Sequence, residues 1–226
     1  MTKAPSIRGS AQARLVLYRL LSGGISDIEF RFLDSNPASW QELLKALEDE
    51  VEVQENEKQI LRQSFSHIEC STREGLQRQI KRLIGKNLWL GVFPQGLLET
   101  FIDEHVLLIK SLRGEYIHKI AIALSRGIRE GRLHKDITKD IRHLTDISKR
   151  RAQLIARNGP LQYSGVITKH HQMSAGITSY IWQSSRDERV RDSHRKYDGK
   201  IFNWKSSGPH PRSEVNCRCD AVPVFV

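Results

Sequence analysis

The chain has 226 residues, of which 38% are hydrophobic and 27% charged, and its formal net charge is +10. This composition suffices for a real hydrophobic core, in one large domain or two small ones. No run of 18 apolar residues occurs, so we expect neither a membrane span nor a membrane partner. The first residues lack the apolar core of a signal peptide. The odd number of cysteines, three, favours a reducing cytoplasm over a disulfide scaffold.

Helical patterns fill the N-terminal part of the chain. Residues 11–21 carry leucines at positions that suit a first helix, and the pair Gly23-Gly24 is expected to end it. Ser39, with Glu42 three residues later, forms a capping box that predicts the start of another helix.

A further helix is expected over residues 72–84, because its apolar side chains fall on one face. The apolar run that follows is interrupted by glycine and proline, and contains Trp89 and Phe93. We expect both of these aromatic side chains in the core. The lone cysteine of this part, Cys70, is expected to be a packing residue.

The middle of the chain also reads as helical. A 3.6-residue period runs over residues 97–128 and predicts one long helix. Two shorter helices are expected over residues 136–144 and 145–157, and Gly159-Pro160 is expected to begin another segment. The neighbouring pair His170-His171 is interpreted as a surface feature, because adjacent residues on a helix diverge by about 100°.

The last fifty residues have a different pattern. Ile177, Tyr180, Ile181 and Trp182 are aromatic or β-branched, which is typical of a short strand. Asp198-Gly199 is a strong turn signal and predicts that residues 201–204 return as a second strand. Residues 221–226 are expected to form the last strand. The small core of this module is expected to consist of Trp182, Phe202 and Trp204.

These patterns predict an α+β fold, which is mainly helical with a small β-containing module at the C-terminal end. We expect three consecutive regions: helical residues 1–95, helical residues 96–176, and the module of residues 177–226.

The module contains candidate metal ligands. Cys217 and Cys219 are two residues apart, so in an extended strand they point the same way, and His194 and His210 precede them. Thiolate and imidazole are the usual ligands of structural Zn²⁺, although C-x-C is a weaker signal than C-x2-C. Two interpretations stay open: a zinc site, or two small buried cysteines with histidines that bind the loop backbone. A disulfide between the two cysteines would be strained.

Charge is distributed unevenly along the chain. Residues 1–109 hold 13 Lys and Arg against 15 Asp and Glu, whereas residues 110–226 hold 23 against 11. Such a basic half can attract a phosphate backbone without sequence specificity, but it is equally compatible with a solvated surface or an acidic protein partner. Candidates for phosphate contact or for an internal ion network are Arg189, Arg191 and Arg218.

A metal-dependent nuclease is an alternative function. The module holds the acidic and imidazole side chains that such an enzyme uses to bind a divalent ion and activate water. The same side chains also build turns and ion pairs, so we expect no catalytic residues. The residues concerned are Asp187, Asp192, His194, Asp198 and His210.

The module also carries a long, irregularly spaced pattern, W-x4-D-x-R-V-R-x2-H-x3-D-G-x2-F, followed by H-P and N-C-R-C. This pattern resembles the phage Mu F-like family of phage head morphogenesis proteins, and the resemblance covers roughly residues 100 to 226. The run from Arg150 to Arg157 resembles the helix that precedes the motif, but Asn158-Gly159 stands where the family often has Thr-Glu. The matching residues are Trp182, Asp187, Arg189, Val190, Arg191, His194, Asp198, Gly199, Phe202, His210, Pro211, Asn216, Cys217, Arg218 and Cys219.

The resemblance implies a minor head protein, an internal capsid component at the portal vertex that acts in procapsid assembly and in DNA packaging or ejection. It implies as partners the portal protein and other capsid or scaffold proteins, with double-stranded DNA as a further partner. The implied location is inside the virion, after assembly in the host cytoplasm. A structural role of this kind is not enzymatic.

Overall fold

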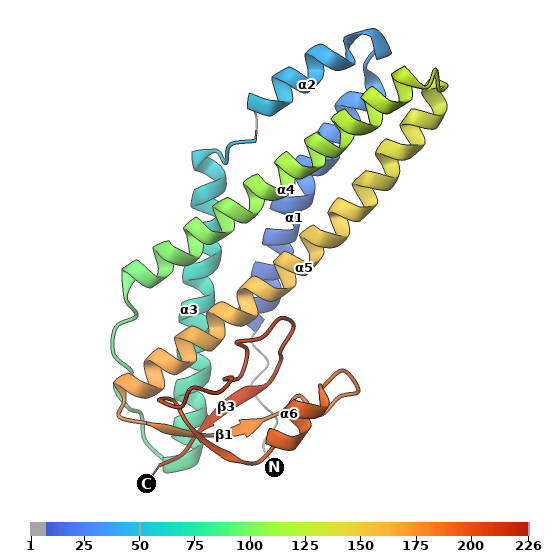
Figure 1. Ribbon diagram of the computed structural model, residues 1–226. Coiled ribbons are helices and arrows are strands. Elements are labelled where there is room, and N and C mark those ends of the chain that lie inside the picture. Colours follow the sequence, from blue (N-terminus) through green and yellow to red (C-terminus); the bar gives the residue numbers. More distant parts are fainter. Residues whose placement is uncertain (1–7, 50, 226) are drawn as a thin grey trace. The chain divides into compact units, whose positions relative to one another are not determined.

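The computed structural model describes residues 8–49 and 51–225 (Figure 1). Within them it contains six α-helices, one short 3-10 helix and one three-stranded antiparallel sheet, so the predicted α+β class is confirmed. None of the helices in this described part is both long enough and apolar enough to cross a lipid bilayer. The helices are α1 (Arg8–Asp34), η1 (Pro37–Ser39), α2 (Trp40–Asp49), α3 (Glu55–Ile84), α4 (Gln95–Arg129), α5 (His134–Ser174) and α6 (Asp192–Tyr197). The strands are β1 (Ser179–Gln183), β2 (Ile201–Asn203) and β3 (Asp220–Pro223).

The chain forms two compact units, each built from segments that are distant in the sequence. One, which we call the mixed unit, contains the described residues up to Arg14, then Gln63–Phe101, and all described residues from Arg157 onward. The other, the helical unit, contains Leu15–Arg62 and Ile102–Ala156. The three consecutive regions expected from the sequence stay a prediction.

The helical unit is held by apolar side chains at helical spacing and by one buried ion pair. Leu17, Leu21 and Ile25 lie on one face of α1 and are buried, because a spacing of four residues returns side chains to the same face. The guanidinium of Arg113 on α4 binds both carboxylate oxygens of Glu57 on α3. These hydrogen bonds from Arg113 keep the pKa of the Glu57 carboxyl below its usual range, although burial alone would raise it.

Gly23-Gly24 does not end the first helix, contrary to the prediction. Helix α1 continues through both glycines to Asp34. A Cβ atom on Gly24 would lie 2.9 Å from Nε of Arg113, so this glycine leaves room for the guanidinium group.

The helix predicted to start at Ser39 is present, because α2 begins at Trp40, but the predicted capping box does not form. The Ser39 hydroxyl donates to the carbonyl of Asn36, and the side-chain oxygen of Asn36 accepts the N–H of Ala38. The Asn36 side chain therefore caps η1, the short 3-10 helix that precedes α2.

Helix α5 runs as one helix where three segments were predicted. The hydroxyl of Thr145, at the expected break, donates to the carbonyl of Ile141 and lies 2.6 Å from the hydroxyl of Tyr116. Pro160 lies inside the helix, and both Gly159 and Pro160 are buried. A proline inside a helix costs about 3 kcal/mol or more, so burial of this stretch outweighs the lost hydrogen bond.

Three other expectations about side chains need correction. His171 is fully buried rather than on the surface, and its ring nitrogens lie 2.8 Å from the carbonyl oxygen of Leu90 and 3.2 Å from Oε1 of Glu69. Trp89 is 75% exposed rather than in the core. Cys70 is exposed on α3 and is not a packing residue.

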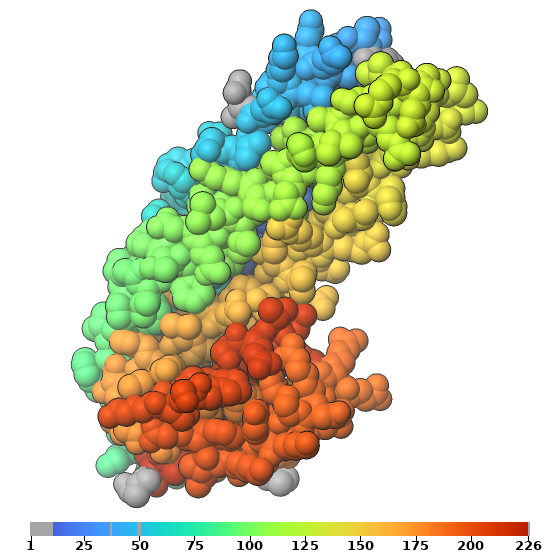
Figure 2. Space-filling view, viewed as in Figure 1, coloured from blue at the N-terminus to red at the C-terminus, as the bar shows by residue number. Residues whose placement is uncertain are grey.

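The sheet lies in the mixed unit and has the order β2-β1-β3, with both pairings antiparallel. Tyr180 pairs with Phe202 on one side of β1, and Ile181 pairs with Val222 on the other. In Figure 2 the orange and red atoms of residues 180–225 form one continuous surface. We call residues 177–225 the C-terminal module.

One side chain of α5 is bonded to both edges of this module. The amide of Gln172 is fully buried; its oxygen accepts the indole N–H of Trp204 at 2.9 Å, and its nitrogen donates to the carbonyl of Ala221 at 2.9 Å. Trp204 follows β2 and Ala221 lies in β3, so a single amide connects the helix to both outer strands. The buried core next to it consists of Tyr180, Trp182, Trp204, Cys217, Cys219 and Ala221.

A glycine on α5 permits a second close contact with the module. A Cβ on Gly165 would lie 3.0 Å from Cβ of Arg212 and 3.1 Å from the carbonyl oxygen of Pro211. We predict that Gly165→Ala lowers the free energy of unfolding by about 1–3 kcal/mol, because it overpacks this contact. Urea denaturation measures the change.

Gly75 on α3 provides the matched control. Its nearest neighbour would lie 3.9 Å from an added Cβ, so Gly75→Ala should stabilise the protein by about 0.5–1 kcal/mol. An equal gain in stability from Gly165→Ala would contradict the packing described here.

Candidate functional site

The structure brings three of the four predicted metal ligands together. Nδ1 of His194, on α6, lies 3.6 Å from Sγ of Cys217 and 3.6 Å from Sγ of Cys219, both of which precede β3. All three ligand atoms lie within 4.8 Å of one another. The three side chains are only 2–3% exposed. We call this set the His–Cys cluster.

The other ring nitrogen of His194 is held by a carboxylate. Nε2 lies 3.1 Å from Oε2 of Glu214, and because a carboxylate accepts, Nε2 carries the proton. Arg191 donates to the same Oε2 at 2.9 Å and to the carbonyl of Val215 at 2.7 Å. In the tautomer that carries its proton on Nε2, the lone pair of Nδ1 is directed at the two sulfur atoms.

N–H groups surround both sulfur atoms. The backbone N–H of Arg212 donates to Sγ of Cys217 at 3.2 Å. A hydrogen bond from Cys219 lowers the pKa of the Cys217 thiol, and donating that bond raises the pKa of Cys219. The indole of Trp182 and the backbone N–H of Ser185 lie close enough to the Cys219 sulfur to lower the pKa of that thiol in part.

His210, the fourth predicted ligand, lies outside the His–Cys cluster. Its Nδ1 shares a hydrogen bond of 2.8 Å with the hydroxyl of Tyr180, and its ring centroid is 5.0 Å from that of Trp204. Burial and the nearby charge of Lys169 both lower the pKa of His210. This histidine therefore contributes to the aromatic core rather than to the sulfur atoms.

The predicted ion network forms only in part. Arg218 holds Asp187 through two hydrogen bonds of 2.5 and 2.7 Å, which keep the pKa of the Asp187 carboxyl below its usual range. Arg191 pairs with Glu214, as described above. Only the backbone N–H of Arg189 contacts Asp187, at 3.1 Å, and its side chain is exposed.

The Asp198-Gly199 turn has its predicted place before β2. The carboxylate of Asp198 accepts the N–H of Ser184 at 2.7 Å, and the N–H of Gly199 donates to the carbonyl of Trp182 at 2.8 Å. Gly199 has φ +79°, a value that favours glycine. Trp182 is fully buried and Phe202 packs against it with ring centroids 5.6 Å apart, so the predicted aromatic core is present.

Sequence reasoning missed the residues that support the cluster. Arg212 is 6% exposed; its guanidinium donates to the hydroxyl of Ser164 at 2.7 Å and forms an ion pair with Asp220. Glu214, which orients His194, has no sequence signal beyond its closeness to Cys217. Gln172 has none at all, since its partners lie 32 and 49 residues away.

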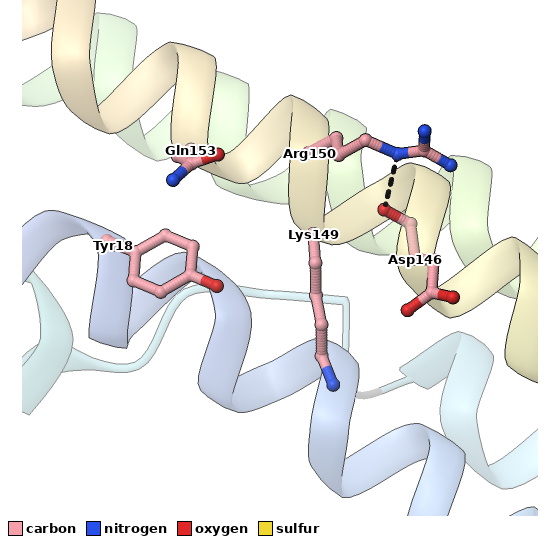
Figure 3. A pocket seen from close by; sticks show the side chains of 5 residues that line it. All are labelled: Tyr18, Asp146, Lys149, Arg150 and Gln153. Carbon is pink, nitrogen blue, oxygen red and sulfur yellow. Dashed lines mark hydrogen bonds between the residues drawn. The ribbon is translucent and has the colours of Figure 1, made fainter.

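A separate hollow lies in the helical unit (Figure 3). Tyr18 of α1 and Asp146, Lys149, Arg150 and Gln153 of α5 line it. Lys149 forms an ion pair of 3.6 Å with Glu29, and Nε of Arg150 donates to the carbonyl of Asp146 at 3.3 Å. Lys149 and Arg150 therefore interact with other residues of the helical unit, and the side chains that line the hollow do not form a set suited to one reaction.

Sequence comparisons agree with the motif of the C-terminal module. Residues 118–222 match the profile of the family described as Phage Mu protein F like protein. A Haemophilus influenzae protein described as uncharacterized is 36% identical over 124 residues, which are 54% of this chain and 28% of that protein. Minor head protein GP7 of Bacillus phage SPP1 is 24% identical over 164 residues, which are 62% of this chain and 53% of that protein. No solved structure matches the chain significantly.

Residues 118–222 are therefore a Phage Mu F-like region, and the resemblance read from the motif is confirmed for them. The chain spans about a quarter and about half of the lengths of these two relatives.

The bridge made by Gln172 gives a direct test of the way the module is held. We predict that Gln172→Leu destabilises the protein strongly, because it leaves the indole N–H of Trp204 and the carbonyl of Ala221 buried without partners. Each such orphaned group costs about 1–3 kcal/mol. Urea denaturation followed by tryptophan fluorescence measures the loss.

Gln162→Leu is the matched control on the same helix. The amide of Gln162 donates to the carbonyl of Ser213 at 3.3 Å and is half-buried, so its loss should change stability by less than about 1 kcal/mol. Equal effects of the two substitutions would contradict the bridging role of Gln172.

Proposed function

We propose that this protein is a minor head protein that acts in phage head morphogenesis, as an internal component of the capsid at the portal vertex. The observation that carries this proposal is the match of residues 118–222 to the Phage Mu F-like family, together with the similarity to minor head protein GP7 of phage SPP1. In this role the protein assembles with portal, shell or scaffold proteins in the host cytoplasm and stays inside the virion.

A non-enzymatic role agrees with the placement of the candidate nuclease residues. Asp187 is bound by Arg218, and Asp198 accepts from Ser184 and Arg186. The side chain of Asp192 is 97% exposed. Within the described residues the sole group of potential metal ligands is the His–Cys cluster, which contains no carboxylate.

Exposed apolar side chains support a protein partner. Trp89 and Val92 are 75% and 81% exposed, the highest fractions among the large apolar side chains of the described residues. Both lie in the segment between α3 and α4, in the mixed unit. A tryptophan exposed to this extent is the kind of side chain that anchors protein interfaces.

Incorporation into heads is the test of this proposal. The full chain should co-purify with procapsids when it is expressed with the shell, scaffold and portal proteins of the phage that encodes it. Omission of the portal protein should abolish its incorporation, which quantitative mass spectrometry of purified particles would detect. Incorporation that is independent of the portal would overturn the portal-vertex location, and absence from all particles would overturn the head role.

The Trp89→Ser/Val92→Ser double variant localises the contact. We predict at least a tenfold lower incorporation, because burial of a large apolar side chain contributes about 1.5–3 kcal/mol. Ile201→Ser, at an apolar side chain that is 65% exposed on β2, is the control that should incorporate normally. If both variants incorporate like the parent protein, Trp89 and Val92 do not form the interface.

The positive charge of the second half supports contact with packaged DNA. Residues 110–226 hold 23 basic against 11 acidic side chains. Arg189 and Lys196 are exposed and form no salt bridge in the described part of the chain, although the charge of Arg189 helps to lower the pKa of the Asp187 carboxyl. Such side chains bind phosphates by releasing counterions, without reading the sequence.

We therefore predict DNA binding that weakens steeply with salt and is the same for unrelated sequences. Arg189→Ala/Lys196→Ala should reduce the slope of log K against log salt by about 2, since each lost phosphate contact removes roughly one unit. Fluorescence anisotropy over a salt series measures the slope. The control Lys58→Ala, which removes a partly exposed lysine paired with Glu55 at 3.5 Å, should leave the slope unchanged. A salt-independent affinity would exclude phosphate contact.

A further inference from the structure

We propose that the His–Cys cluster is a structural zinc site, in which Nδ1 of His194 and the sulfur atoms of Cys217 and Cys219 bind one ion. The ion would join α6 to the segment that precedes β3. This site is independent of the proposed role in the phage head, because it concerns how the C-terminal module holds together rather than what the module contacts.

The spacing of the ligand atoms suits a tetrahedral ion. Zinc bonds of about 2.3 Å to sulfur and about 2.0 Å to nitrogen, at a tetrahedral angle, separate the two atoms by roughly 3.5 Å. Both sulfur atoms lie 3.6 Å from Nδ1 of His194. A neutral imidazole has one lone pair on this nitrogen, so it cannot accept a proton from both thiols at once. One ion placed between the three atoms uses that lone pair and both sulfur atoms.

The surroundings of the sulfur atoms favour negative charge. The backbone N–H of Arg212 is directed at Cys217. The indole Nε1 of Trp182 is buried and has no hydrogen bond of ordinary geometry in the described residues, although it lies near Cys219. Donors of this kind stabilise thiolates. Two adjacent buried thiolates repel each other unless a cation lies between them, and a divalent ion supplies that charge.

The carboxylate behind His194 completes the pattern. In histidine metal sites the ring nitrogen that does not bind the ion usually donates to a carboxylate, which fixes the tautomer and orients the ring. Glu214 has this position, 3.1 Å from Nε2, and its own orientation is fixed by Arg191. Glu214 contacts the side of the imidazole opposite the sulfur atoms, so it orients the ligand and does not bind the ion.

The segment that carries the sulfur atoms is held in an unusual conformation. Arg212 and Asn216 have φ of +69° and +59°, which non-glycine residues rarely adopt. Arg212 is kept there by Ser164 and Asp220, and the N–H of Asn216 donates to the side chain of Asn158. Contacts with α5 thus position the segment before any ion binds, which reduces the cost of assembling the site.

His194, Cys217 and Cys219 fill three of the four positions of a tetrahedral ion. The ligands are closed off by Trp182, whose ring centroid lies 5.0 Å from that of His194, and by the core of the module. A small β-containing module with a thin core gains most from such an ion, because the binding free energy adds to its folding free energy.

Metal analysis of the full, untagged chain tests the proposal. The protein is purified without chelators, and its metals are quantified by inductively coupled plasma mass spectrometry. About one zinc per chain is expected. The Cys217→Ser/Cys219→Ser variant should lose it, whereas Cys70→Ser and His210→Gln should keep it, because Cys70 and His210 lie outside the cluster. Cobalt added to the metal-free protein should produce the absorption bands of a tetrahedral thiolate site in every variant that retains both sulfur atoms and His194.

Glu214→Gln keeps the test decisive if the double cysteine variant fails to fold. This variant retains all three ligands, and loss of the carboxylate should weaken zinc binding about 10- to 100-fold in a competition titration. Zinc-free protein that also gives no thiolate bands with cobalt would overturn the proposal. Zinc retained by a folded double cysteine variant would overturn it as well, as would a Cys217–Cys219 disulfide in freshly purified protein.

Discussion

The buried amide of Gln172 is the constraint on which the C-terminal module depends. It forms hydrogen bonds with the indole N–H of Trp204 and the carbonyl of Ala221 at the same time. The ends of both outer strands are therefore attached to one side chain of α5. A buried amide is stabilising only when its hydrogen bonds are complete, and here both of these partners lie in the module. The positions of the aromatic core and of the two cysteines therefore depend on α5 as well as on the small sheet.

Sequence reasoning predicts the C-terminal module well but fails at the helix boundaries. The strands, the Asp198-Gly199 turn and the aromatic core of the module were predictable, since residue type and short-range spacing determine them. The helix breaks were not, because Gly23-Gly24 and Pro160 are local signals that burial overrides. His194 and the two cysteines could be recognised as candidate ligands by type. His210 lies away from the two cysteines because it contacts Tyr180 and Trp204. These residues are 30 and 6 positions away in the sequence, and no local pattern reveals the contacts.

Different parts of the mixed unit carry different kinds of chemistry. The His–Cys cluster and its supporting residues are buried, whereas Arg189 and Lys196 are exposed on the neighbouring segment, and Trp89 and Val92 are exposed between α3 and α4. The groups that hold the module are thus separate from the exposed side chains proposed to contact a partner. The buried set lies within residues 118–222, the range that matches the family.

The strand order β2-β1-β3 also determines when the module can form during synthesis. The central strand, β1, is made first, and its second neighbour, β3, emerges about forty residues later, after both cysteines. Until then Gln172 has no Ala221 to bond, and one edge of β1 is open. The sheet is therefore completed late, and a nascent chain that stalls before residue 220 leaves one edge of β1 unpaired, the kind of edge that promotes aggregation.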